Sequence, residues 1–155
     1  MYTKPMRRQD RQLSEEETYA LLESGEYGVL STVDAEHDPY GVPLSYALLD
    51  GKIVFHCAAG VGHKLENIAQ NPHVCFTVVG KTKILPQKFS TAFESVIAFG
   101  TVAPAEEPAA ALRALVKKYS PDYQEKGDAY IAASAHEAGV YAIAIEKITG
   151  KARRP

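Results

Sequence analysis

The segment YGVPLSYALLDGKIVFHC at residues 40–57 decides the fold, because two apolar runs flank the Asp50-Gly51 pair in its middle. An Asp-Gly pair between such runs is the strongest short signal for a hairpin turn. We therefore expect residues 40–49 and 52–57 to form neighbouring antiparallel strands. Pro43 donates no ladder hydrogen bond, so its strand is expected at a sheet edge or a bulge.

The rest of the chain predicts more strands, with helices inserted between them. Further strands are expected at 27–33, 73–79, 92–103 and 140–148. Ser14 and Glu17 form a capping box before a short helix that ends near Gly25. Helical spacing predicts three more helices, at 62–70, 106–119 and 122–134. Residues 80–91 lack periodicity and predict a surface loop. This pattern indicates an antiparallel α+β barrel and not a parallel fold.

The composition is that of a soluble protein with one domain. The chain has 155 residues, of which 46% are hydrophobic and 23% charged. A formal net charge of -2 argues against binding to nucleic acid or an anionic membrane surface. No signal peptide or membrane-spanning run is recognisable, so a cytoplasmic location is expected. Residues 1–12 and 149–155 are expected to be flexible or to contact a partner.

Several kinds of chemistry lack support in the sequence. Cys57 and Cys75 fall in strand-like segments without C-x-x-C spacing, which favours reduced, buried thiols. The five histidines show none of the usual metal-binding spacings, so no metal site is expected. No serine lies in a nucleophile elbow, and hydrolysis is therefore not predicted.

The segment FHCAAGVGHKLENI at residues 55–68 has the layout of an anion site. A strand leads through a small-residue loop into a helix that opens with His63 and Lys64. Gly60 and Gly62 allow close approach of the backbone, and the first helical turn offers free N–H groups. The spacing is neither that of a P-loop nor that of a Rossmann turn. His56 could reach the ring of a bound nucleotide, although a structural role is the commoner one for a strand histidine.

Five motifs together resemble a known family. They are GVLSTVD at 28–34, PYGVPLSY at 39–46, FH at 55–56, GHK at 62–64 and SVIAFG at 95–100. In this order they are similar to the flavin-binding split-barrel proteins related to pyridoxamine 5'-phosphate oxidase, in the branch of the nitroimidazole-resistance proteins. The resemblance implies one domain with a six-stranded, Greek-key split β-barrel and flanking helices. It also implies FMN bound in a cleft at a homodimer interface.

The resemblance assigns roles to individual residues. Those expected at the cofactor are Val42, Pro43, Leu44, Ser45, Tyr46, Phe55, His56, Cys57, His63, Lys64 and Ser95. The strand from Val42 to Tyr46 would line the flavin ring and ribityl chain, and His63 and Lys64 would hold the phosphate. Ser95 would face the same phosphate, although its strand position also suits a solvent-facing serine. His56 would donate a proton or position the substrate.

The implied activity is an FMN-dependent oxidoreductase acting on nitroaromatic or other small planar compounds. A nicotinamide nucleotide is a candidate electron donor. The chain has no Trp, and Val42 and Ala47 stand where the oxidase has Arg and Lys, which argues against vitamin B6 oxidation. Two alternatives stay open: a deazaflavin-dependent reductase of the same fold, and a non-catalytic flavin or haem binder in which a histidine ligates iron.

Overall fold

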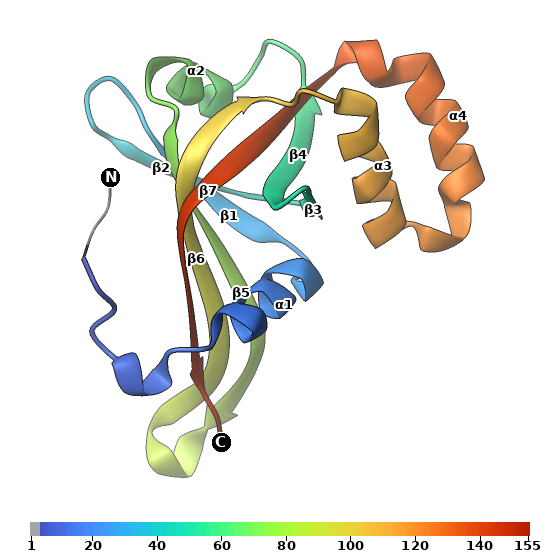
Figure 1. The fold of residues 1–155 in the computed structure, drawn as a ribbon. Coiled ribbons are helices and arrows are strands. Elements are labelled where there is room, and N and C mark those ends of the chain that lie inside the picture. Colours follow the sequence, from blue (N-terminus) through green and yellow to red (C-terminus); the bar gives the residue numbers. More distant parts are fainter. Residues whose placement is uncertain (1–3) are drawn as a thin grey trace.

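The structure, a computed structural model, describes residues 4–155, which form one antiparallel sheet with flanking helices (Figure 1). The strands are β1 (Gly28–Val33), β2 (Pro39–Leu44), β3 (Ala47–Leu49), β4 (Lys52–Ala58), β5 (His73–Leu85), β6 (Ser90–Pro104) and β7 (Ala138–Arg153). The α-helices are α1 (Glu15–Ser24), α2 (His63–Gln70), α3 (Pro108–Tyr119) and α4 (Gln124–Ser134). Short 3-10 helices are η1 (Gln9–Arg11), η2 (Pro86–Lys88), η3 (Pro121–Tyr123) and η4 (Ala135–Glu137). No helix within residues 4–155 has the length and apolarity needed to cross a membrane.

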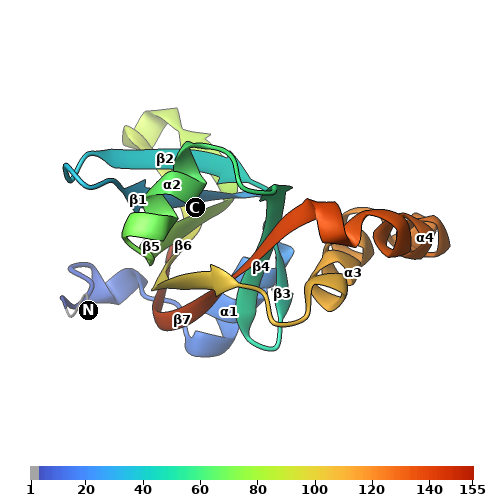
Figure 2. The same ribbon diagram turned by 90° about the horizontal axis from the view of Figure 1, so that it is seen from above.

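The sheet has the strand order β2-β1-β5-β6-β7-β4-β3. The predicted antiparallel α+β fold with flanking helices is confirmed, but the described residues form seven strands and not six. The difference arises in residues 40–49, which were expected to form one strand and instead form β2 and β3. These two consecutive strands lie at opposite edges of the sheet. The sheet curls but stays open, consistent with a split barrel (Figure 2).

The turn at Asp50-Gly51 forms the expected hairpin. Asp50 and Gly51 have φ angles of 51° and 74°, the left-handed values that a tight two-residue hairpin turn requires. On either side of the turn, Leu49 pairs with Lys52. The strand that contains Pro43 lies at the edge of the sheet, as its missing N–H predicts.

Residues 80–91 do not form the surface loop that was expected. Strand β5 continues to Leu85, where it pairs with Ser90 of β6, and η2 joins the two strands. The pairing shifts register between Val79 and Thr82, so the hairpin continues past an irregularity. Both of its faces are largely exposed, with Phe89 at its tip 97% exposed. Because neither face is buried, pairing here needs no alternation of apolar and polar residues, and the usual strand signal is missing.

The C-terminal segment is part of the sheet. Residues 149–155 were expected to be flexible or to contact a partner, whereas β7 runs on to Arg153, which pairs with Phe93 of β6. Gln12 bridges to Lys151, and the Leu13 N–H donates to the Gly150 carbonyl at 2.9 Å. Backbone pairing on both sides therefore orders this segment. Residues 1–3 of the expected N-terminal extension lie outside the described residues.

Two apolar cores lie on the two faces of β4. Phe55 and Ile53 point into the main core inside the curled sheet, where both are fully buried. Val54 points the other way and packs with Ala111 and Leu115 of α3. This alternation is the normal period of a strand, and it places the next residue on the α3 side, His56, near the helices.

A buried tyrosine joins the crossover between β2 and β3 to two helices. Tyr46 has no exposed surface, and its hydroxyl donates to the Leu22 carbonyl at the end of α1. Its backbone N–H donates to the Tyr119 hydroxyl at 3.0 Å, and that hydroxyl donates to the Glu26 carbonyl at 2.6 Å. Burial raises the pKa of Tyr46, and the nearby Tyr119 adds to the rise.

Lys118 covers the same tyrosine. Its Nζ lies 3.7 Å from the centre of the Tyr46 ring and, among the described residues, has no hydrogen-bond partner. Burial lowers the pKa of this amine to about 8, although the carboxylate of Glu23 opposes the shift. An ammonium over an aromatic face is attracted by the ring, which partly offsets the lost hydration.

We expect Tyr119→Phe to lower the free energy of unfolding by about 1–3 kcal/mol, because it leaves the buried Tyr46 N–H without an acceptor. Urea unfolding followed by circular dichroism measures the change. Tyr123→Phe is the matched control, since Tyr123 is 61% exposed and its hydroxyl has no hydrogen bond within residues 4–155. Equal stability of the two variants would show that Tyr119 does not fasten α3.

Candidate functional site

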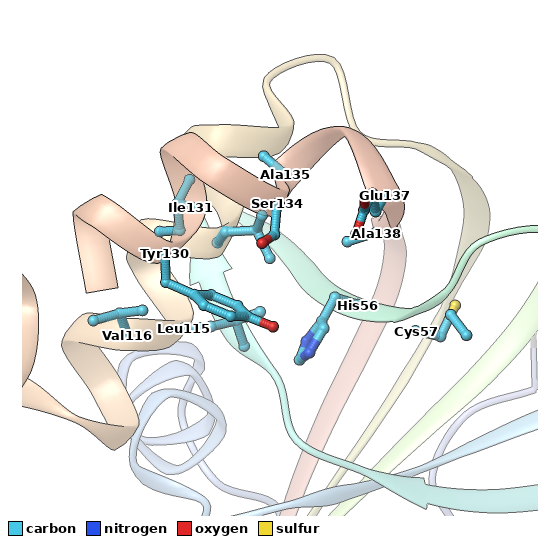
Figure 3. Close-up of a pocket in the computed structure, with 12 residues that line it drawn as sticks. His56, Cys57, Leu115, Val116, Tyr130, Ile131, Ser134, Ala135, Glu137 and Ala138 are labelled. Atoms are coloured by element: carbon cyan, nitrogen blue, oxygen red, sulfur yellow. The ribbon is translucent and has the colours of Figure 1, made fainter. Parts of the chain in front are cut away.

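The candidate site surrounds the end of β4, where the chain leaves the sheet. His56 is exposed and Cys57 is half-buried, and both line a pocket against α3 and α4 (Figure 3). Phe55, the residue before them, is fully buried in the main core and holds this strand end in place. Of the three strand residues predicted at the site, two are therefore accessible and one is structural.

On the other side of this strand end, α2 begins with free backbone donors. Gly62 is its N-cap residue, with φ 110° and no side-chain cap. Its carbonyl accepts from the N–H groups of Leu65 and Glu66, while those of His63 and Lys64 have no partner within residues 4–155. A Cβ at Gly60 or Gly62 would meet nothing within 4 Å, so the space beside these two glycines is open. Free donors and the helix dipole favour an anion here.

Buried hydrogen bonds fix the position of α2 against the sheet. The amide of Asn67, 2% exposed, donates to the Thr32 hydroxyl of β1 at 2.9 Å. That hydroxyl in turn donates to the Tyr40 carbonyl of β2. One turn earlier, the His63 ring stacks on the Tyr40 ring with centroids 4.1 Å apart. The start of α2 is thus held against the edge strand β2.

Sequence reasoning missed Tyr40, Thr32 and Asn67. One signal was available: His63 and Asn67 are four residues apart, so a helix places both on one face. An amide that the helix turns toward the sheet would be expected to need a buried hydrogen-bond partner. Nothing in the sequence names Thr32 as that partner, because the contact joins residues 35 positions apart.

Electrostatics connect the two sides of the site. Partial burial raises the pKa of the Cys57 thiol, and the positive charge of Lys64 acts against that rise. The Lys64 charge therefore acts on the end of β4, and the helix start and the strand end belong to one region. Cys75 lies elsewhere, on β5 beside Thr77, and burial raises the pKa of its thiol also. Both cysteines are free and half-buried.

The predicted segment from Val42 to Tyr46 presents different faces. Val42 and Leu44 are half-buried and pack against the main core, whereas Pro43 and Ser45 are exposed. The Tyr46 side chain is wholly inside and cannot touch a ligand. Because β2 is an edge strand, its outer backbone groups face away from β1. Within the described residues, no neighbouring strand pairs with that side of β2.

Ser95 does not join the other predicted residues within one chain. It lies on β6, half-buried, opposite Val79 of β5 and Lys151 of β7. The strands β5 and β1 separate β6 from β2. Within residues 4–155 its hydroxyl forms no hydrogen bond with α2. The sequence order of the motifs could not reveal this separation, since it depends on the strand order.

The sequence matches the model of a protein family, and the fold matches solved structures. The family is described as pyridoxamine 5'-phosphate oxidase, and the match covers residues 14–152. No curated protein matches the sequence significantly.

Three solved structures share the fold. A candidate 5-nitroimidazole antibiotic resistance protein from Bacteroides thetaiotaomicron is 21% identical, with a TM-score of 0.74, 91% of this chain and 86% of that chain covered. A conserved hypothetical protein from Mycobacterium tuberculosis is 20% identical, with a TM-score of 0.81, and the match covers 97% of this chain and 91% of that chain. An FAD and haem binding protein from Mycobacterium smegmatis is 18% identical, with a TM-score of 0.81, and the match covers 94% of this chain and 74% of that chain. At these identities the likeness shows the fold.

We expect Lys64→Ala, in a Cys75→Ala background, to slow the labelling of Cys57 by iodoacetamide at pH 8. Loss of the positive charge raises the thiol pKa further, so less reactive thiolate is present at that pH. The rate of mass increase measures the effect. Lys52→Ala, at the other end of β4, is the control and should label at the unchanged rate. Identical labelling rates in the Cys75→Ala protein and its Lys64→Ala and Lys52→Ala variants would show that the Lys64 charge does not act on Cys57.

Proposed function

We propose a flavin-dependent oxidoreductase function for this chain, which belongs to the pyridoxamine 5'-phosphate oxidase family. The observation that carries the proposal is the placement of two features beside one strand end. An uncapped helix start with Lys64 lies on one side of the end of β4, and an apolar pocket bordered by His56 lies on the other. This arrangement suits a phosphate-bearing cofactor with its acceptor nearby.

The residues present fit FMN. The N–H groups of His63 and Lys64, together with the Lys64 ammonium, offer the donors that a phosphate needs. The open space at Gly60 and Gly62 supports the approach of an anion to this loop. The free edge of β2 supplies backbone groups for a planar ring. When bound, FMN would supply the electron or hydride transfer.

The chain itself would supply binding, orientation and a proton. Lys64 and the α2 amides would neutralise the phosphate, and the Asn67–Thr32 hydrogen bond would keep them in place. The exposed imidazole of His56 would donate a proton to the acceptor as it is reduced, or position it. A nicotinamide nucleotide would serve as electron donor. The description of the Bacteroides structure as a candidate nitroimidazole-resistance protein supports small nitroaromatic acceptors.

The proposal includes a homodimer with the cofactor at the subunit interface. Pro43, Val29, Thr77 and Ile97 lie in one row across β2, β1, β5 and β6. None of them is fully buried, and Ile97 is 37% exposed. Ser95 lies two residues before Ile97 and therefore shares this outer face. A second copy that covers the face would place Ser95 at an interface, where it could contribute to the partner's site.

We expect Lys64→Ala to weaken FMN binding about tenfold to a hundredfold, because a charge-assisted hydrogen bond is lost. His56→Ala should keep its FMN but lose turnover with a nitroaromatic acceptor by about a hundredfold or more. Flavin fluorescence and anaerobic stopped-flow absorbance measure the two effects, with Lys52→Ala as control.

The same samples test the choice of cofactor. Purified protein should show flavin absorbance, and heat should release FMN as identified by mass spectrometry. Released FAD, or a haem Soret band in place of the flavin spectrum, would overturn the FMN proposal. The Soret band would favour haem ligation, for which the exposed His56 beside an apolar pocket is the candidate. Equal FMN loss in the Lys64 and His56 variants would show that Lys64 does not act in cofactor binding and His56 in turnover as two separate roles.

We expect Ile97→Glu to convert the dimer to a monomer, since it places a charge in the centre of the proposed interface. Light scattering measures the mass. The flavin content measures the effect on the site and should decrease when the dimer is lost. Ala132→Glu on the exposed side of α4 is the control and should stay dimeric with full flavin content. A monomeric wild-type protein that holds FMN fully would refute the shared site.

A further inference from the structure

The pocket beside His56 combines an apolar floor with a polar rim. Its volume is about 410 Å³, within the range that holds small organic ligands. Leu115 and Ile131, 7% and 5% exposed, form the floor where α3 faces α4. The polar side chains that line it come from β4, α4 and η4, and they are His56, Tyr130, Ser134 and Glu137.

Three of these polar groups are available for a ligand. Within residues 4–155 the His56 ring and the hydroxyls of Tyr130 and Ser134 have no hydrogen-bond partner. Figure 3 shows the Tyr130 hydroxyl directed toward the His56 ring, with Ser134 above them. An imidazole and two hydroxyls can each donate to an acceptor atom held between them.

The charge around the pocket disfavours anions. None of the described residues that line it is lysine or arginine, and Glu137 is its one carboxylate. Glu137 lies 3.7 Å from the Nε2 of His136, and both side chains are exposed. An exposed pair of this kind is weak, so Glu137 is left as the one negative charge at the rim.

The helical wall of the pocket is preorganised. A Cβ at Gly127 of α4 would lie 2.6 Å from the Val116 Cγ1, so only glycine allows this close contact with α3. Val116 also lines the pocket, and the end of α3 is fastened to the crossover by Tyr119. These contacts hold α4 against α3 and so fix the apolar floor, which reduces the ordering cost of binding.

We infer that this pocket is the acceptor site, and that it selects uncharged single-ring aromatic compounds bearing a nitro or carbonyl group. The ring lies on Leu115 and Ile131, and the accepting oxygen is held by Tyr130, Ser134 and His56. Glu137 excludes carboxylate-bearing analogues of the same size. The catalytic part of this assignment rests on the proposed flavin-dependent function, whereas binding and charge selection depend on the pocket alone.

The experiment compares 4-nitrobenzyl alcohol with 4-nitrobenzoate as probes of the oxidised protein, with binding measured by calorimetry and flavin content measured separately. The alcohol should bind at least tenfold more tightly than the carboxylate. Tyr130→Phe should weaken binding of the alcohol about threefold to tenfold, the effect of one lost hydrogen bond. Tyr123→Phe, an exposed tyrosine outside the pocket, should change nothing. Glu137→Gln should improve binding of the carboxylate, and Glu125→Gln on α4 should not.

The outcomes separate this inference from the proposed function. Equal affinity for the two probes, or an unchanged affinity in Tyr130→Phe, would overturn the acceptor site even if the protein holds FMN. Selective binding of the alcohol by a protein that holds no flavin would support the pocket and overturn the flavin proposal. Reduction of the alcohol's nitro group by the holoprotein, slowed in Tyr130→Phe through a higher KM at unchanged flavin content, would support both.

Discussion

The buried side chain of Tyr46 is the contact on which the arrangement of the molecule depends. The chain crosses here from one edge of the sheet to the other, between β2 and β3. Its hydroxyl holds the end of α1, its backbone N–H holds Tyr119 at the end of α3, and its ring packs edge-on against Phe76 in the main core. Burial of so large a side chain is favourable only because each polar group has a partner.

This contact also determines where the candidate site lies. With β3 and β4 at the other edge of the curled sheet, β4 can present Val54 to α3 and Phe55 to the main core. His56 then lies between the sheet and the helix pair. The chain returns through α2, which Asn67 fastens to β1, so the free donors of α2 lie beside β2. The pocket and the helix start are thus placed by two separate buried anchors.

Local chemistry explains what could be predicted. The Asp50-Gly51 turn, the Ser14-Glu17 capping box and the helix after Gly62 depend on neighbours within a few residues, and all three form as expected. The hairpin arm at 80–91 and the strand end at 149–153 were missed because backbone pairing with a distant segment orders them. Pairing of this kind satisfies N–H and C=O groups whatever the side chains are, and leaves little trace in the sequence.

The sequence by itself determined the elements that depend on near neighbours, the family and the candidate residues at the end of β4 and the start of α2. Only the tertiary structure decided which of those residues can act together. It split residues 40–49 between two sheet edges, buried Tyr46 and Phe55, and set Ser95 apart on β6. It also brought Tyr130 and Ser134 beside His56, about 75 residues away along the chain. The physical reason is that strand order and helix docking follow from burial of the whole apolar surface, which no short segment encodes.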